Sequence, residues 1–273
     1  MNIYENLKLI YNQDIKLNKT DLGLTNTIYT ATINNQKVAL REVTTNLASL
    51  AFTNEAKALS LVKPLNLDAI EIYYNETNRL RITKWIDNAI EFKDFKDKKD
   101  AIKRAALLLK KLHSAKLVSN VVFDGVLLLK EYQENIDLEL FDLSQFDDVI
   151  KKYQSVNNEK ILCHNDLVSG NILFTEEKDY LIDYEYSKDN DPLFDVMSFL
   201  TENQITDPEL REIFFQNYFD AELSNKKKIE LDIFENFHNL LWCSWANMMY
   251  DKHHKDIYKE IATDKYQALI RKK

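Results

Sequence analysis

The segment ILCHNDLVSGNILF, residues 161–174, decides the fold because it sets a polar run between two apolar ones. The polar run holds His164, two asparagines, Asp166 and one of the three glycines of the chain. The β-branched and aromatic residues on both sides predict strands, and the polar run predicts a loop between them. A loop anchored by core strands at both ends is suited to positioning side chains.

The polar residues of this loop have the spacing of a phosphoryl-transfer site. His164, Asp166 and Asn171 follow the pattern H-x-D-x-x-x-x-N. Residues 171–174 and 180–183 are predicted to form a hairpin around the turn TEEKD, and Asp183 ends its second strand. Phosphoryl transfer needs a carboxylate that accepts a hydroxyl proton and oxygen ligands for Mg²⁺, and these residues supply both. The alternative is that they serve only as turn residues.

Composition and charge narrow the class of protein. The chain has 273 residues, 45% of them hydrophobic, which is enough for a large core. Its formal net charge of -8 argues against a nucleic-acid partner and suits a cationic small molecule. The N-terminal segment interleaves charged and apolar residues, and no apolar run reaches the ~18 residues of a membrane span, so we expect a cytoplasmic protein. Cys163 and Cys243 lack metal-binding spacing and are expected to be reduced thiols, to which we assign no role.

The pattern of elements changes near residue 86. Residues 20–86 contain the alternating segments TIYTATINN, QKVALREV and AIEIYYNETNRLRITKWI, with the helical stretch SLAFTNEAKALSLV before the third, which predict a small antiparallel sheet with one helix. Later residues are mostly helical, as in DKKDAIKRAALLLKKLHSA, and we expect only the strands at 171–174 and 180–183 among them. The prediction is an α+β, bilobal fold with lobes of residues 1–86 and 87–273 and a ligand cleft between them.

The segments CHNDLVSGNILF and LIDYEYSKDNDPLFDVMSFLTE resemble the catalytic and metal-binding motifs of the choline/ethanolamine kinase family. This family is a branch of the protein-kinase-like fold shared with aminoglycoside phosphotransferases. The resemblance implies a nucleotide-binding N-terminal lobe and a catalytic, acceptor-binding C-terminal lobe. It also implies that Asp166 is the catalytic base, that His164 supports the catalytic loop, and that Asn171 and Asp183 bind Mg²⁺.

The N-terminal lobe carries the residues expected to hold the phosphates of ATP. By the same resemblance, Gly23, Thr25 and Asn26 lie where the family has a phosphate-covering turn, and Arg41 lies where its members have a basic residue on the third strand. Glu55, on the following helix, is expected to pair with Arg41 and direct it toward the phosphates. The alternative is a solvated arginine on a strand and a glutamate on an exposed helix face.

The connector between the lobes is the expected adenine site. Backbone groups of Lys84, Trp85 and Ile86 are expected to hydrogen-bond the edge of the base. Leu173 or Ile182 is expected to pack beneath its ring. His113, at the end of a predicted helix, is interpreted as structural and is left out of the site.

Two tryptophans bear on the acceptor. Trp242 and Trp245 are three residues apart on a predicted helix, so both indoles project from one face. They are either core residues or the wall of a pocket. Choline kinases, which the chain resembles, have a Trp-x-x-Trp helix in this part of the chain whose rings enclose the trimethylammonium group. A quaternary ammonium has no N–H to donate, so aromatic faces recognise it by cation–π contact.

Other acceptor residues follow from the same resemblance. Glu185 and Glu202 stand where the family has acidic residues lining the acceptor pocket, and Tyr186 and Tyr258 are expected additional walls. Asp195 corresponds to a third family acid and is expected to be mainly structural. The further aromatics of eukaryotic members are not matched after the tryptophan pair, so ethanolamine or another amino alcohol stays open as an alternative acceptor.

The leading hypothesis is an ATP- and Mg²⁺-dependent kinase that phosphorylates choline to phosphocholine. One alternative is an ethanolamine kinase or an aminoglycoside-type phosphotransferase, although polyamine antibiotics call for an acidic rather than an aromatic wall. A pseudokinase that acts as a binding module is the alternative from another class, against which the retained Asp166, Asn171 and Asp183 argue. The sequence does not specify the number of subunits, and a homodimer is one expectation.

Overall fold

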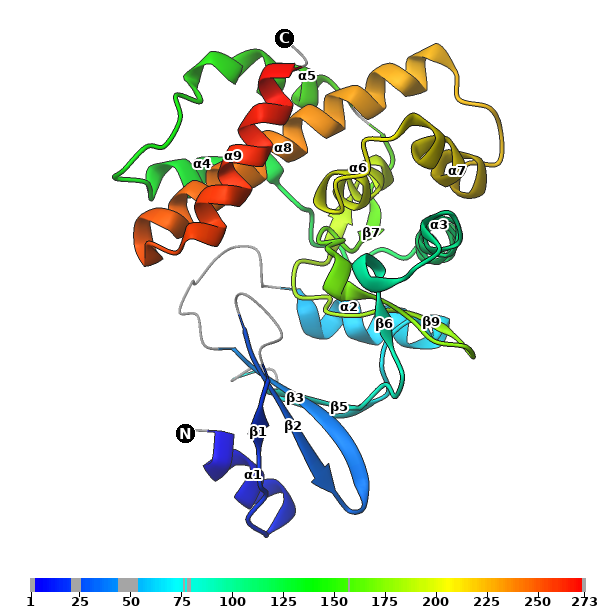
Figure 1. Ribbon diagram of the computed structural model, residues 1–273, viewed down its shortest axis with the longest axis vertical. Coiled ribbons are helices and arrows are strands. Elements are labelled where there is room, and N and C mark those ends of the chain that lie inside the picture. Colours follow the sequence, from blue (N-terminus) through cyan, green and yellow to red (C-terminus); the bar gives the residue numbers. More distant parts are fainter. Residues whose placement is uncertain are drawn as a thin grey trace.

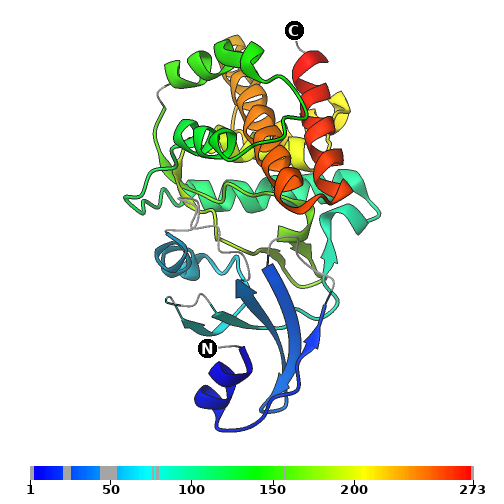
Figure 2. The same ribbon diagram turned by 90° about the vertical axis from the view of Figure 1, so that its left-hand side faces the viewer.

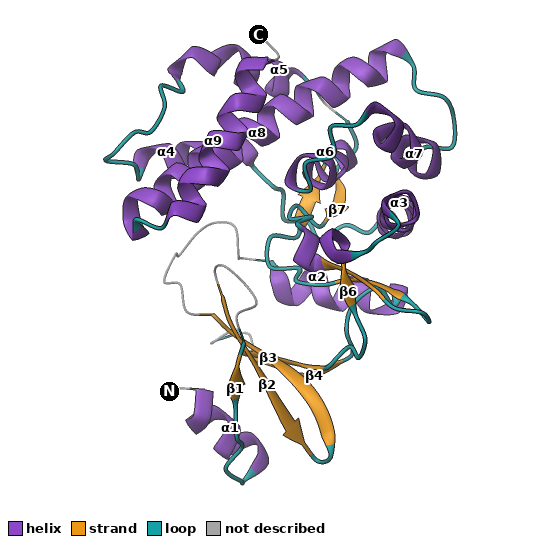
Figure 3. Cartoon of the chain, viewed as in Figure 1, coloured by secondary structure: helices purple, strands orange, loops and turns teal. Residues whose placement is uncertain are grey.

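The computed structural model describes residues 3–20, 26–43, 54–75, 77, 80–156 and 158–271. These residues form a small part built on an antiparallel sheet and a large part built mostly of helices (Figure 1). Figure 3 shows the same division by secondary structure, with the N-terminus at the sheet end and the C-terminus at the helical end. The predicted α+β, bilobal architecture is confirmed.

A five-stranded antiparallel sheet forms the N-terminal part, with strand order β1-β2-β3-β5-β4. Its strands are β1 Asn18–Lys19, β2 Asn26–Ile33, β3 Gln36–Val43, β4 Glu71–Asn75 and β5 Leu80–Lys84. Asn34 and Asn35 turn β2 into β3 with φ of 50° and 62°, the left-handed geometry that a two-residue hairpin turn requires. Helix α1, Ile3–Tyr11, buries Ile3 and Leu7 in the small core of this sheet.

Helix α2, Glu55–Val62, follows the third strand but packs into the larger core. Its buried Ala58, Leu59 and Val62 join a cluster made mostly by the C-terminal helices. The 3-10 turn η2, Lys63–Leu65, continues the helix. Figures 1 and 2 place α2 between the sheet and the helical part. Residues 44–53, which include the start of the predicted helical stretch, lie outside the described residues.

The C-terminal part is predominantly helical. Its helices are α3 Lys98–Ser114, α4 Gly125–Glu134, α5 Asp147–Ser155, α6 Pro192–Glu202, α7 Pro208–Tyr218, α8 Asn225–His253 and α9 Asp256–Arg271, with 3-10 turns η3 Phe92–Asp94, η4 Ser144–Phe146 and η5 Ser169–Asn171. The predicted apolar face of α3 is confirmed: Ile102, Ala105, Ala106, Leu108, Leu109 and Leu112 are all buried. Helices α8 and α9 lie side by side in both views (Figures 1 and 2).

Short strands hold the loops of the C-terminal part. The predicted hairpin is present as β8, Ile172–Phe174, and β9, Asp179–Leu181, and β6, Ile90–Glu91, adds a third strand beside β8. Asp183 therefore follows the second strand of the hairpin by two residues instead of ending it. The N–H of Ile182 still donates to the carbonyl of Asn171 at 2.9 Å, which keeps the two segments together beyond the last ladder pair.

The expectation of only the two hairpin strands in this part is wrong, whereas the strand predicted on the N-terminal side of the polar loop is present. Besides β6, the segments β7, Ile161–Cys163, and β10, Lys188–Asn190, pair as a separate antiparallel sheet. Strand β10 has the sequence KDN, which carries no apolar alternation, so periodicity could not reveal it. This pairing holds together the two ends of the segment that contains the predicted catalytic motifs. Among the described helices, none has both the length and the apolar character needed to cross a membrane.

Candidate active site

The loop between β7 and β8 carries the predicted catalytic base. Asp166 is half-buried, and Asn171, in η5, is buried beside it. The side-chain Nδ2 of Asn171 donates to the backbone carbonyl of Asp166 at 3.0 Å and to its Oδ2 at 3.1 Å. The amide nitrogen thus fixes the carboxylate of Asp166. The oxygen Oδ1 of Asn171 is the atom of this amide suited to a cation.

His164 is fully buried and holds the loop through hydrogen bonds of both its ring nitrogens. Its Nε2 donates to the carbonyl of Ile182 at 2.9 Å, and its Nδ1 accepts the N–H of Asp166 at 3.3 Å. Burial lowers the pKa of His164, which agrees with a neutral ring that donates through one nitrogen and accepts through the other. His164 therefore ties Asp166 to the segment that leads into Asp183. It is a positioning residue, because both ring nitrogens contact backbone groups.

Asp195 anchors the same loop from the first turn of α6. Its carboxylate is fully buried and accepts the backbone N–H of His164 and that of Asn165, each at 2.7 Å. The Nε2 of His113 lies 3.0 Å from the same carboxylate, and the Nδ1 of His113 lies 2.7 Å from the hydroxyl of Tyr218. The expectation that Asp195 and His113 are structural agrees with these contacts.

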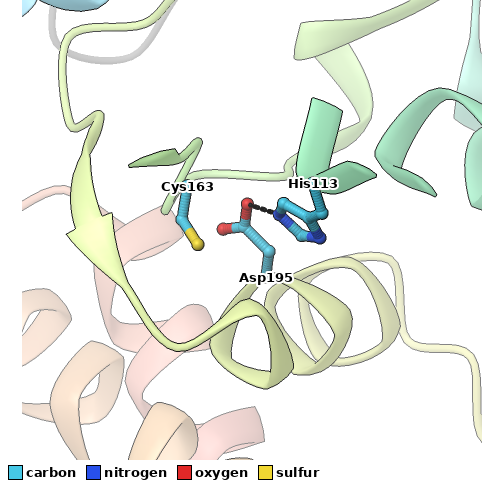
Figure 4. Close-up of side chains that lie close together, drawn as sticks. All are labelled: His113, Cys163 and Asp195. Carbon is cyan, nitrogen blue, oxygen red and sulfur yellow. Dashed lines mark hydrogen bonds and ion pairs between the residues drawn. The ribbon is translucent and has the colours of Figure 1, made fainter. Parts of the chain in front are cut away.

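His113, Cys163 and Asp195 converge closely enough to suggest a metal centre (Figure 4). The thiol of Cys163 donates to the carbonyl of Asn190 at 3.4 Å, and burial raises its pKa well above the ordinary value, so it stays protonated. Both oxygens of Asp195 already accept backbone N–H groups. The cluster is therefore explained as a hydrogen-bond network that holds the catalytic loop.

Sequence reasoning missed Asn165. Its φ of 65° is left-handed, a conformation that asparagine tolerates better than most residues. Its Nδ2 donates to the carbonyls of Tyr186 and Lys188 at 3.1 and 3.3 Å, and its Oδ1 accepts from Asn190 at 2.9 Å. Asn165 thus joins the catalytic loop to the segment after Asp183. An asparagine directly before the base was the available signal.

Asp183 meets the N-terminal part through Arg41. The guanidinium of Arg41 on β3 donates to Asp183 at 2.5 Å and also forms an ion pair with Glu55 on α2. The expected pairing of Arg41 with Glu55 is confirmed. Tyr74 donates to the other oxygen of Glu55 at 3.2 Å. Burial alone would lower the pKa of Arg41, but the surrounding carboxylates raise it above the ordinary value, so the guanidinium stays charged.

Glu185 belongs to the same ionic cluster. Its Oε2 lies 3.9 Å from Arg41 and accepts the side-chain Nδ2 of Asn26 at 2.8 Å. Burial, with repulsion from Asp183, raises the pKa of Glu185 to about 7, although Arg41 and Asn26 lower it. These contacts lie on the Arg41 side, where the nucleotide was expected, and not among the aromatic rings predicted for the acceptor.

The structure describes only some of the other residues that were predicted to bind the phosphates and the adenine of ATP. Gly23 and Thr25 lie outside the described residues, and Asn26 begins β2. In the connector, the backbone N–H of Lys84 donates to the carbonyl of Ile70 at 2.8 Å, and the backbone N–H of Trp85 donates to the carbonyl of Lys37 at 3.0 Å.

These two donors are therefore engaged within the protein, and the candidate groups for an adenine edge are the connector carbonyls and the N–H of Ile86. Leu173 and Ile182 are both half-buried, as an adenine platform requires.

The four predicted acceptor aromatics form one continuous row of rings. Tyr186 contacts Trp242 with centroids 5.7 Å apart, Trp242 contacts Trp245 at 5.6 Å, and Trp245 contacts Tyr258 at 5.7 Å. Interplanar angles of 74°, 81° and 86° make each contact edge to face, the preferred arrangement of aromatic pairs. All four side chains are buried: Tyr186 and Trp242 are each 6% exposed, Trp245 is 8% exposed and Tyr258 is 2% exposed.

Glu202 stands at the end of α6 and is paired. Lys265 on α9 donates to its Oε1 at 2.6 Å, and the Nδ1 of His238 lies 3.6 Å from the same oxygen. His238 also accepts the indole N–H of Trp242 on Nε2 at 2.8 Å. Sequence reasoning did not find Lys265 or His238, because neither belongs to a motif with fixed spacing.

Tyr132 on α4 is a further missed residue. Its side chain is buried and hydrogen-bonds with Tyr186. Burial raises its pKa, and the charges of Glu131 and Asp166 raise it further. The backbone carbonyl of Tyr186 accepts the side-chain Nδ2 of Asn165 at 3.1 Å, so the ring row ends at a residue that is hydrogen-bonded to the predicted catalytic loop.

Negative charge converges on Asp166. Burial raises the pKa of Asp166 well above its usual range. The carboxylates of Asp183 and Glu202, and that of Glu185, raise it further. A site with this many carboxylates around one loop favours the binding of cations.

The chain is similar to known proteins in both sequence and structure. A model described as "Phosphotransferase enzyme family" matches residues 21–227. Protein LicA of Haemophilus influenzae is 25% identical over 190 residues, which cover 62% of this chain and 68% of that protein. The match of the family model over residues 21–227 includes the predicted catalytic loop and most of the sheet.

Solved structures resemble almost the whole chain. The choline kinase LicA from Streptococcus pneumoniae has a TM-score of 0.79 at 20% identity, over 98% of this chain and 96% of that chain. An ethanolamine kinase from Plasmodium vivax has a TM-score of 0.77 at 18% identity, over 98% of this chain and 83% of that chain. At these identities the matches establish the fold.

Proposed function

The chain belongs to the phosphotransferase enzyme family, and we propose that it transfers the γ-phosphoryl group of ATP to the hydroxyl group of choline. The products are phosphocholine and ADP, and the proposed cofactor is Mg²⁺. Residues 1–86 are proposed to bind the nucleotide. Residues 87–273 are proposed to carry the catalytic loop and the acceptor pocket.

One observation carries the choice of acceptor: the row of rings from Tyr258 ends at Tyr186, whose backbone carbonyl accepts from Asn165 of the catalytic loop at 3.1 Å. A quaternary ammonium group binds to aromatic faces, with about 0.5 to 2 kcal/mol per ring. The carboxylates around Asp166 add a favourable field for a cation. A polyamine antibiotic would instead need several hydrogen-bonding carboxylates along the wall.

Asp166 is the proposed general base. Its carboxylate accepts the hydroxyl proton of choline while that oxygen attacks the γ-phosphorus of ATP. A new O–P bond forms, and the bond between the γ-phosphorus and the bridging oxygen breaks, leaving its electron pair on ADP. Asn171 holds the carboxylate in place, and His164 and Asp195 hold the loop that presents it.

Asn171 and Asp183 are the proposed ligands of Mg²⁺. An amide oxygen and a carboxylate suit this hard cation, and the hydrogen bonds from Asn171 to Asp166 use its nitrogen and not its oxygen. Bound Mg²⁺ would neutralise developing charge on the transferred phosphoryl group. Arg41, oriented by Glu55, is proposed to contact the phosphates when ATP is bound.

A coupled assay of ADP release tests this function. Purified protein is incubated with ATP, Mg²⁺ and one of choline, ethanolamine, thiamine or kanamycin, and the product is identified by mass spectrometry. We expect the highest kcat/KM with choline and the appearance of phosphocholine. Turnover with kanamycin and none with choline would overturn the choice of acceptor. No acceptor-dependent ADP release in a folded protein that binds ATP would favour a binding module.

A further inference from the structure

Glu202, the carboxylate predicted to attract a cationic acceptor, already forms an ion pair with Lys265. Glu202, at the end of α6, accepts from Lys265 at 2.6 Å, and the two side chains are 15% and 8% exposed. Lysine is seldom this buried unless it is paired. The pair joins α6 to α9, the helix that also supplies Tyr258 to the ring row.

The ion pair adjoins the aromatic wall. The hydroxyl of Thr201, the residue before Glu202, lies 2.8 Å from the Nδ1 of His238. The Nε2 of His238 accepts the indole N–H of Trp242 at 2.8 Å. On the other side of Glu202, Asn203 donates its side-chain Nδ2 to the carbonyl of Leu167, in the loop that carries Asp166, at 2.8 Å. Glu202 therefore stands between the rings and the catalytic loop.

His238 is not the counter-ion of Glu202. An indole N–H can only donate, so the Nε2 of His238 must be unprotonated, and its Nδ1–H donates to Thr201. Thr201 in turn donates to the carbonyl of Met197 at 2.8 Å, which completes a consistent chain of donors and acceptors. Burial, together with the charge of Lys265, lowers the pKa of His238 well below its usual value. Lys265 thus carries the compensating charge.

We propose that Lys265 determines acceptor specificity by occupying Glu202. A primary ammonium brings three N–H donors that must find acceptors in a buried pocket, whereas a quaternary ammonium brings none. Lys265 already fills one oxygen of Glu202 with an N–H of the same kind. The proposed acceptor site therefore offers its rings to a quaternary ammonium and withholds its carboxylate from a primary one. This inference rests on the proposed function.

The test compares kcat/KM for choline and for ethanolamine in wild type and in Lys265→Met. Freeing Glu202 is expected to move the ethanolamine-to-choline ratio about 10-fold toward ethanolamine, the scale of one charge-assisted hydrogen bond. Lys265→Arg, which keeps the charge, should keep the wild-type ratio. Lys259→Met, an exposed lysine on the same helix, is the matched control and should also keep it.

Two further variants separate specificity from packing. Glu202→Gln leaves Lys265 without its counter-charge, so the KM for choline should rise about 10-fold while the KM for ATP stays the same. Adding Lys265→Met to Glu202→Gln removes that charge and should restore most of the choline KM. If Lys265→Met does not fold, the ethanolamine-to-choline ratio of kcat/KM is measured in Lys265→Gln instead. Thermal melts of every variant report whether it folds.

A wild-type ratio in folded Lys265→Met and Lys265→Gln would overturn the assignment of specificity. A double variant no better than Glu202→Gln would overturn it as well. If wild type phosphorylated neither amino alcohol, the proposed function would fail before any variant is compared. The two failures are therefore distinguishable.

Discussion

Asn171 donates both to the backbone carbonyl of Asp166, at 3.0 Å, and to its carboxylate, at 3.1 Å. One side chain thereby fixes the position of its neighbour in the loop and the orientation of that neighbour's acid group. A base held in this way needs little reorganisation when an acceptor hydroxyl arrives.

Asp166→Ala removes the proposed base. We expect kcat to fall by at least ~10², the usual scale for losing a positioned general base, while the fold and ATP binding persist. Steady-state kinetics and a thermal melt measure both. Glu176→Ala, which removes an exposed carboxylate from the turn of the adjoining hairpin, should leave both unchanged. Near-normal turnover in folded Asp166→Ala would remove this residue from the mechanism.

Asp183→Asn replaces an anionic oxygen ligand with a neutral amide. Mg²⁺-dependent turnover should be lost and the affinity for Mg²⁺–ATP should fall, as measured by calorimetry. Asn171→Ala should have the same effects less severely. If affinity and activity both survived in Asp183→Asn, this residue would only be a partner of Arg41 that stabilises the fold.

Trp242→Leu and Trp245→Leu test the aromatic wall. Each removes a ring quadrupole but keeps an apolar side chain, so choline binding should weaken by about 0.5 to 2 kcal/mol. That loss corresponds to a rise in KM of roughly 2- to 30-fold, with the KM for ATP unchanged. Trp242→Phe keeps a ring and loses only the bond to His238, so its defect should be smaller. A lower melting temperature without a selective choline defect would return these residues to the core.

His238 predicts a pH dependence of stability. Its pKa is lowered in the folded protein, so below about pH 6.5 the unfolded chain takes up a proton that the folded protein excludes. The free energy of unfolding therefore loses about 1 kcal/mol between pH 7.5 and pH 5.5 through this residue. In His238→Gln this loss is absent, so the stability advantage of wild type over the variant should shrink by that amount.

Melting temperatures of both proteins at the two pH values provide the measurement. The gap between them should narrow by roughly 2 to 4 °C at the acidic pH. An unchanged gap would mean that the folded protein protonates His238 at pH 5.5, with Glu202 at 3.6 Å as its partner.

Local patterns in the sequence predicted much of this molecule. Asp166 and Asn171 lie five positions apart, and the hairpin before Asp183 has its turn between its two short strands, so both could be inferred from short segments. The pairing of Arg41 with Glu55 joins neighbouring elements and was likewise within reach.

Long-range partners could not be inferred in this way. Lys265 and Glu202 lie 63 positions apart, and a single lysine on a helix carries no sign of the acid that it contacts. Asp195 accepts backbone N–H groups of His164 and Asn165, about 30 positions earlier in the chain. This contact depends on how α6 packs in the core, which a local pattern does not specify. Strand β10 is polar and forms because β7 lies beside it, so pairing overrides local pattern there.

The guanidinium of Arg41 also affects how the chain unfolds. Its partner Glu55 comes from the N-terminal half of the chain, whereas Asp183 and Glu185 come from the C-terminal half. If either half came apart first, the other would retain buried charges without partners, at a cost of several kcal/mol. The halves are therefore linked in stability. Although the molecule has two lobes, this one side chain favours a single cooperative unfolding transition over two independent ones.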